Sequence, residues 1–285
     1  MKVSLRGGFS DRNLIKEISK EIQYNSLNQR TRIKISNEIS KYAHFICERV
    51  YDIKKLSEIS MVILDKLYSQ KINHFECYYL ENVVTHVCNT ILKDDYDDAL
   101  TAVEFVSTIF HLALRNYGIT YDSQIYEKIN DIFKDEFVGY RFVDEKIVQI
   151  TNETEIAAIE EALSQKNDKV KEFLQKAINF ISISGGKDYA NSIKESITAV
   201  EALCKLIVGN DSGTLGGALK IIEKKKSIHP AFKEALLKLY GFTSDESGIR
   251  HGGNVVKTDL GFEDAKFILV TCSAFINYMI DIIGE

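Results

Sequence analysis

The stretch that decides the fold class is residues 188–208, which read DYANSIKESITAVEALCKLIV. Its apolar side chains recur every three or four positions, the spacing of one face of an α-helix. That face consists of Ala190, Ile193, Ile197, Val200, Cys204 and Ile207. Ser196 and Glu201 fall at the two margins of the face, where side chains are half buried. Residues at such margins suit a role in which the core holds them while they reach a cleft.

The same periodicity continues on both sides of this segment. It predicts further helices at residues 153–164, 168–180, 215–225, 230–240 and 262–283. Pro230 is well placed in the first turn of its helix, where no backbone N–H is needed. The last helix is apolar nearly all round, so we expect it at the centre of a bundle or in a dimer contact.

The first half of the chain follows the same rule from Asp11 to about Glu136. Faces such as Ile33, Ile35 and Ile39 predict a bundle of five or six helices. The acidic run at residues 94–98 marks a break before a helix at 99–116, and Gly118 is the expected C-cap. This half is an all-helical domain by its pattern.

The helical pattern changes between Phe137 and Ile150, where the sequence is FVGYRFVDEKIVQI. Apolar and polar residues alternate there around Asp144 and Glu145, which predicts a β-hairpin. The predicted fold is therefore mainly α in three parts. Residues 1–136 form an N-terminal helical bundle, residues 137–151 a β-hairpin connector, and residues 152–285 a C-terminal helical bundle.

Composition limits the class of protein. A net charge of −5 argues against a surface that coats DNA, and a single proline favours long helices. The start, MKVSLRGGFSDRN, has no signal-peptide core, and the apolar run 268–283 is too short to span a bilayer. The five cysteines lack metal-binding spacing. We expect a cytoplasmic protein with free thiols, no membrane association, no metal and no cofactor.

One polar segment, GFTSDESGIRHGGNVVKTDLG at residues 241–261, is longer than an ordinary connection between helices. It contains Arg250 beside His251, a fixed cation for phosphate next to a group that exchanges protons near neutral pH. The alternative is that Arg250 only braces the loop by pairing with Asp245 or Glu201. The residues alone leave both interpretations open.

Four strings resemble the C-terminal HEPN-superfamily domain of AbiJ-type abortive-infection proteins: SIKESITAVEALCKLI (192–207), TLGGALK (214–220), HPAFKEALLKLYGFTSDESGIRHGG (229–253) and DAKFILVTCSAFINYMI (264–280). The segments FSDRN (9–13) and IQYNSLNQRTRIKISNEI (22–39) are similar to the N-terminal domain often joined to it, and residues 139–163 are similar to the connecting segment. The resemblance covers nearly the whole chain.

The resemblance implies a toxin-like role in bacterial defence against phage. Many HEPN domains are metal-independent endoribonucleases that form a homodimer with a composite cleft. Arg250 would then stabilise charge on the transition state and His251 would move protons, with Glu201, Asp245 and Glu246 as orienting or base residues. Contacts to the RNA partner would come from a further set, Lys205, Ser196 and Asn254.

The sequence departs from that pattern in one respect. HEPN nucleases separate the arginine and the histidine by about four to six residues, whereas Arg250 and His251 are adjacent. Adjacent residues on a helix do not share a face. Either the loop brings both into one cleft, or two copies combine them, or the domain has lost the chemistry. The second hypothesis is therefore a non-catalytic helical dimer that binds RNA, a nucleotide or a phage-encoded trigger as a sensor.

Overall fold

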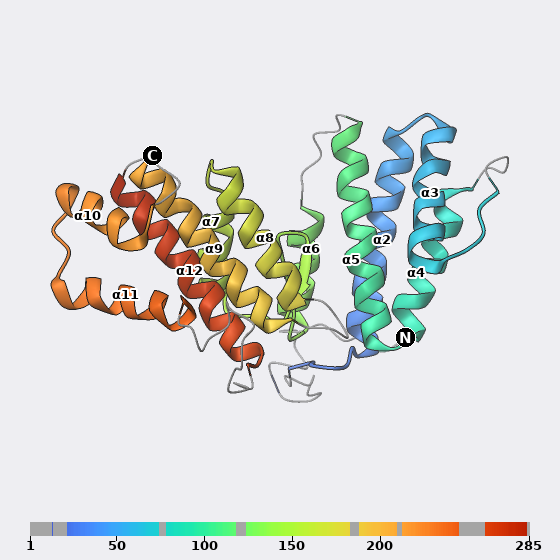
Figure 1. Ribbon diagram of the computed structural model, residues 1–285. Helices are drawn as coiled ribbons and strands as arrows, with labels where there is room; N and C mark the ends of the chain where they lie inside the picture. The colour runs from blue at the N-terminus through green and yellow to red at the C-terminus, as the bar shows by residue number, and fades with distance from the viewer. Residues whose placement is uncertain are drawn as a thin grey trace. The chain divides into compact units, whose positions relative to one another are not determined.

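The computed structural model describes residues 13, 22–73, 78–117, 124–182, 188–209, 213–244 and 260–283. Within these residues the protein has eleven α-helices and one two-stranded hairpin, so the prediction of a mainly α fold is confirmed (Figure 1). The chain divides into two compact units, Met1–Ile147 and Val148–Glu285.

The described part of the first unit contains five helices. They are α2 (Gln29–Arg49), α3 (Ile53–Tyr68), α4 (Leu80–Lys93), α5 (Tyr96–Asn116) and α6 (Ile125–Asp135). Helix α4 packs against α2, α3 and α5 around a core of fully buried side chains that includes Ile39, Val87 and Phe110. The number of helices agrees with the prediction, and Gly118 lies outside the described residues.

One expected core position in α2 is wrong. Ile35 and Ile39 are fully buried, but the Ile33 side chain is 45% exposed. Residues two positions apart on a helix point about 200° apart, so Ile33 and Ile35 cannot both face the core. The i, i+4 pair Ile35 and Ile39 takes the core face and leaves Ile33 on the surface.

The predicted hairpin is confirmed. Strands β1 (Arg141–Val143) and β2 (Lys146–Val148) pair across a turn at Asp144 and Glu145. Both turn residues have positive φ, 46° and 67°, which two-residue hairpin turns need to match the twist of their strands. On α5, the Glu104 carboxylate accepts hydrogen bonds from the Ile147 N–H at 2.6 Å and from Lys146 Nζ at 3.1 Å. These bonds fix the hairpin to the first unit.

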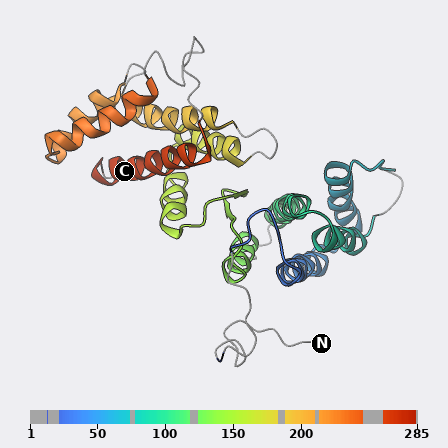
Figure 2. The ribbon, with the colours of Figure 1, turned by 90° about the horizontal axis from the view of Figure 1, so that it is seen from below.

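The second unit contains the six helices predicted for it. They are α7 (Glu153–Leu163), α8 (Asp168–Ser182), α9 (Tyr189–Val208), α10 (Leu215–Lys225), α11 (Pro230–Ser244) and α12 (Phe262–Ile283). Helices α8 and α12 both pack against α9, and α12 also packs against α7 and α10 (Figure 2). The largest difference from the prediction is at the end of α11, which continues to Ser244.

Helix α12 packs against α7, α8, α9 and α10 but is only partly buried, because the Phe267 side chain on its outer face is 57% exposed. The expectation that the apolar run 268–283 is too short to span a bilayer does not hold for the whole helix, which begins at Phe262. Among the described residues α12 is the one helix long and apolar enough to cross a membrane, judged by length and composition alone. Leu269, Ile276 and Met279 are fully buried within the unit, as in a core helix. Asn277 Nδ2 donates hydrogen bonds of 2.9 Å to the Ala158 carbonyl and to Glu161 Oε2, which ties α12 to α7.

Candidate functional site

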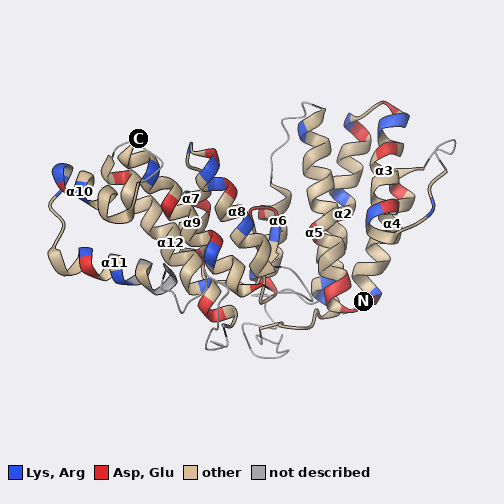
Figure 3. Cartoon of the chain, in the orientation of Figure 1, with Lys and Arg blue, Asp and Glu red and all other residues tan. Residues whose placement is uncertain are grey.

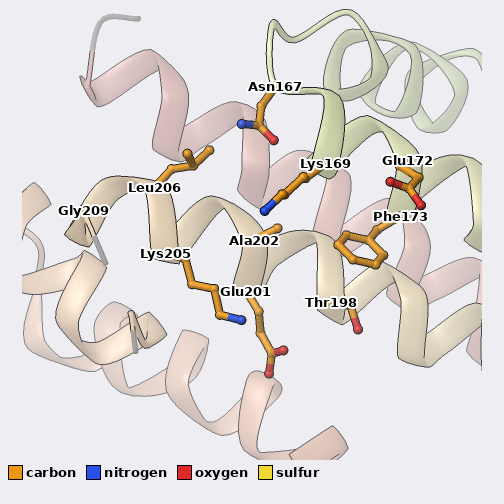
Figure 4. A pocket seen from close by; sticks show the side chains of 10 residues that line it. All are labelled: Asn167, Lys169, Glu172, Phe173, Thr198, Glu201, Ala202, Lys205, Leu206 and Gly209. Atoms are coloured by element: carbon orange, nitrogen blue, oxygen red, sulfur yellow. The ribbon is translucent and has the colours of Figure 1, made fainter. Parts of the chain in front are cut away.

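The second unit contains a pocket of about 630 Å³ between α8 and the second half of α9. Its lining residues are Asn167, Lys169, Glu172, Phe173, Thr198, Glu201, Ala202, Lys205, Leu206 and Gly209. Figure 4 shows their side chains gathered from the two helices around one space. The volume lies within the range of ordinary small-molecule sites.

Helix α9 contributes one wall through residues spaced three and four positions apart. Thr198, Glu201 and Lys205 share a face for that reason, while Val200 and Cys204 face the core. Glu201 is half buried, as predicted for a residue at the margin of the apolar stripe, and Lys205 is exposed. Glu201 therefore places a carboxylate at the edge of the pocket, and the longer Lys205 side chain lines the same wall.

Helix α8 contributes the other wall. Asn167 caps this helix, because its Oδ1 accepts the Val170 N–H at 2.9 Å. Lys169 and Phe173 then follow one turn apart and both line the pocket. The Phe173 ring is half buried and provides the apolar part of the wall. Lys176 Nζ lies 5.1 Å from the centre of that ring, a cation–π distance.

Two lysines and two glutamates line the pocket, but one of the glutamates is paired with a lysine outside the lining. Glu172 is neutralised by Lys176, whose Nζ is 2.6 Å from Oε1; the hydrogen bond from Lys176 and its charge lower the pKa of Glu172. Lys169 and Lys205 have no ion-pair partner within the part of the chain that the structure describes. With Glu201 as the remaining carboxylate, the pocket has a surplus of positive charge. Basic and acidic residues lie close together along α8 (Figure 3).

The structure brings together two of the residues predicted for the site, Glu201 and Lys205. Arg250, His251, Asp245, Glu246 and Asn254 lie outside the described residues, and so does the proposed pairing of Arg250.

Ser196 does not belong to the pocket. Its side chain is fully buried, and its hydroxyl donates to the Ser192 carbonyl at 2.9 Å. The prediction of a half-buried position is wrong because Ser196 lies on the margin that is covered by packing, where Ser192 donates to the Ala177 carbonyl of α8 at 2.8 Å. The residue has no exposed surface with which to contact RNA.

Sequence reasoning missed Lys169, Phe173 and Thr198. The periodicity of the sequence predicted α8 and α9, but it does not say which helices are neighbours. The sequence therefore contains no sign that α8 contributes side chains to the pocket. Across the described ranges, no group of three or more His, Cys, Asp or Glu side chains is placed to hold a metal ion.

The fold is mainly α, as expected from the sequence, and the described part of the second unit contains a pocket. A family profile tests the resemblance to AbiJ-type proteins directly: the profile of AbiJ N-terminal domain 4 matches residues 7–165, more than half of the chain. The chain therefore belongs to the AbiJ N-terminal domain 4 family, and it is an abortive-infection protein of antiviral defence.

Comparison with curated proteins and with solved structures gives no match. The family match confirms the AbiJ resemblance of the first part of the sequence. The HEPN resemblance of the later residues stays a prediction. The match also continues through the hairpin and α7, so it extends past the end of the first unit.

Proposed function

We propose that this abortive-infection protein is a metal-independent endoribonuclease whose second unit works as a HEPN-like homodimer. The observation that carries the proposal is the position of Glu201 and Lys205 on one face of α9, beside a pocket with surplus positive charge. A carboxylate within reach of a bound phosphate can accept a proton, and an unpaired ammonium can hold the phosphate in place. The resemblance of residues 192–280 to HEPN domains supports the same conclusion.

The proposed reaction is a transesterification of the RNA backbone. The ribose 2′-oxygen attacks the adjacent phosphorus while its proton passes to a base. Glu201 is the candidate for this base within the part of the chain that the structure describes. The bond between phosphorus and the 5′-oxygen breaks, and the leaving oxygen takes a proton from His251. Arg250 stabilises the extra negative charge of the transition state. The products are a 2′,3′-cyclic phosphate and a 5′-hydroxyl end, so the substrate must be RNA.

Dimerisation is part of this proposal because Arg250 and His251 are adjacent in the sequence. In a homodimer, Arg250 of one copy and His251 of the other can meet at a shared cleft even though neighbours on one helix diverge. Asp245 and Glu246 stay candidates for orienting the histidine, and Asn254 for contacting RNA.

The test begins with expression in bacterial cells. Wild-type protein should slow growth and degrade cellular RNA, whereas His251→Ala should do neither while it folds normally. Purified protein should cleave RNA in the presence of EDTA, and Lys205→Ala should lower the cleavage rate by about tenfold or more, the effect of losing one charge-assisted contact. Lys220→Ala, an exposed lysine of α10 outside the pocket, is the matched control and should cleave like wild type.

Intact RNA after incubation with folded wild-type protein would overturn the nuclease proposal. If that RNA is nevertheless bound, and if Lys205→Ala weakens the binding, the second hypothesis of a non-catalytic sensor takes its place. Size-exclusion chromatography with light scattering tests the homodimer separately, because a monomer at working concentration contradicts a shared cleft.

A further inference from the structure

We infer that the pocket between α8 and α9 binds a nucleoside phosphate, with the phosphate between Lys169 and Lys205 and the base against Phe173. The ligand is either a free mononucleotide or one nucleotide unit of an RNA strand. The inference deepens the proposed function, on which its RNA arm rests, but binding of a free nucleotide does not require cleavage.

The phosphate position follows from the two lysines. Lys169 comes from α8 and Lys205 from α9, and both line the pocket. In Figure 4 the Lys169 side chain extends toward α9, and the Lys205 side chain extends alongside Glu201. The Glu201 carboxylate, which also lines the pocket, offsets the charge of one ammonium group, and the charge of the second still favours an anion there. Neither has an ion-pair partner in the described ranges, whereas nearby Lys176 is engaged with Glu172. A phosphate would satisfy both ammonium groups at once.

The base position follows from Phe173. Its half-buried ring lines the pocket, so it offers an aromatic surface at a fixed place on α8. Bases of every kind stack on aromatic side chains, so a base of any type can use this ring. Inorganic phosphate alone would leave this apolar wall in contact with water, which favours a ligand with an aromatic part.

Two polar side chains suit the sugar and the base edge. The Thr198 hydroxyl donates its hydrogen to the Lys194 carbonyl at 2.8 Å, so its oxygen retains lone pairs for a ribose hydroxyl. Asn167 uses its Oδ1 to cap α8, and its Nδ2 hydrogens have no acceptor among the described residues. These groups add a donor and an acceptor on opposite helices, which match the hydrogen-bonding groups of a nucleoside.

The experiment is calorimetric titration of the full chain with adenosine 5′-monophosphate, adenosine and inorganic phosphate as probes. The monophosphate should bind at least about tenfold more tightly than either fragment, because it alone reaches both the lysines and the ring. Lys169→Ala and Lys205→Ala should each weaken its binding about tenfold. Phe173→Leu should weaken the monophosphate but leave inorganic phosphate unchanged. Lys220→Ala is the control that should change nothing, and circular dichroism checks the fold of each variant.

A short oligouridine RNA distinguishes the two sources. If RNA binds through Lys169 and Lys205 while the free monophosphate does not, the occupant is a unit of RNA and the inference stands. His251→Ala should abolish cleavage and keep nucleotide binding, so failure of the nuclease proposal is visible apart from failure of this one. The inference is overturned if neither probe binds at millimolar concentration, or if binding is unchanged in both lysine variants.

Discussion

Arg30 and Glu136, 106 positions apart in the chain, form an ion pair in which the arginine Nε lies 2.9 Å from both carboxylate oxygens. Lys34 Nζ lies 2.5 Å from Oε1 of the same carboxylate. The Glu136 side chain is fully buried, whereas the two cations keep 20% and 34% of their side-chain surface exposed. Gln23 Nε2 also donates to the Glu136 backbone carbonyl at 2.5 Å. The start of α2, the end of α6 and the segment before α2 therefore meet at one residue.

Replacing Glu136 with glutamine should destabilise the first unit by about 2–3 kcal/mol, because it leaves two partly buried cations without their counter-charge. Urea unfolding followed by circular dichroism measures the loss. The matched control is Glu172→Gln, which breaks the exposed i, i+4 pair with Lys176 and should have no measurable effect. Equal midpoints for Glu136→Gln and wild type would show that the buried pair contributes nothing.

The same carboxylate gives the first unit a specific pH dependence. Burial alone would raise the pKa of Glu136, but hydrogen bonds and charges from Lys34 and Arg30 outweigh it and lower the pKa. A lowered folded-state pKa stabilises the fold at pH values above the ordinary carboxyl pKa of about 4.3. That contribution is lost as the pH falls through the lower folded-state value. Urea midpoints measured from pH 7 to pH 3 should fall more steeply for wild type than for Glu136→Gln, and parallel curves would contradict the assignment.

The hairpin turn can be made more stable. Glu145 has a φ of 67°, a left-handed conformation that costs a side-chain-bearing residue about 1–2 kcal/mol and glycine far less. Glu145→Gly should therefore raise the free energy of unfolding by up to about 1 kcal/mol, measured by denaturant titration. The same substitution at Glu58, an exposed position inside α3, should lower it by about 1 kcal/mol. A lower free energy of unfolding for both variants would mean that the Glu145 side chain contributes more stability than its left-handed backbone conformation costs.

Gly213 determines how closely the start of α10 approaches α9. A Cβ at this position would lie 2.6 Å from Lys205 Cα and 2.9 Å from the Cys204 carbonyl oxygen, closer than real Cβ atoms approach backbone. Gly213→Ala should therefore cost about 1–3 kcal/mol and weaken ligand binding at Lys205. At Gly216 the nearest atom would be Thr214 Oγ1 at 4.0 Å, so Gly216→Ala should be neutral or stabilising. Thermal melts of the two variants provide the comparison, and equal melting temperatures would refute the close approach.

Two thiols should resist alkylation while the protein is folded. Burial raises the pKa of Cys272 to about 12, and burial with the nearby Glu201 charge raises that of Cys204 to about 12. At pH 8 only about one molecule in ten thousand then carries either thiolate, which is the reactive form. Iodoacetamide followed by mass spectrometry should label both cysteines in urea and neither in buffer, with half-buried Cys88 as the internal reference. Rapid labelling of native Cys204 would show that α9 opens.

The helices of the second unit could be predicted almost to their ends because local signals coincide with the periodicity. Asn152, Asp188 and Thr214 each accept a backbone N–H in the first turn of the helix that follows them. The hairpin could also be predicted from local sequence, because the alternation of apolar and polar residues places its turn at Asp144 and Glu145. Signals within about ten residues were sufficient for both.

The pocket could not be predicted, because helical periodicity does not show which helices become neighbours. Ser196 and Glu201 occupy equivalent margins of α9 by their angles, yet Ser196 is fully buried and Glu201 is only half buried. Packing over one margin separates them, and periodicity within α9 carries no information about that packing. Lys169 and Phe173 were missed for the same reason, because their importance comes from facing α9 across a pocket.

Helix α7 belongs to the matched family domain by sequence and to the second unit by packing. Its buried residues Ile159, Ala162 and Leu163 form an apolar face within the second unit, where Asn277 of α12 binds its backbone. A chimaera that transplants this family domain onto another effector would carry a helix whose contacts were selected for α12. Swapping at residues 149–151, just before Asn152, would keep α7 with α12. Modules are therefore better exchanged near the boundary between the two structural units than at the end of the family match.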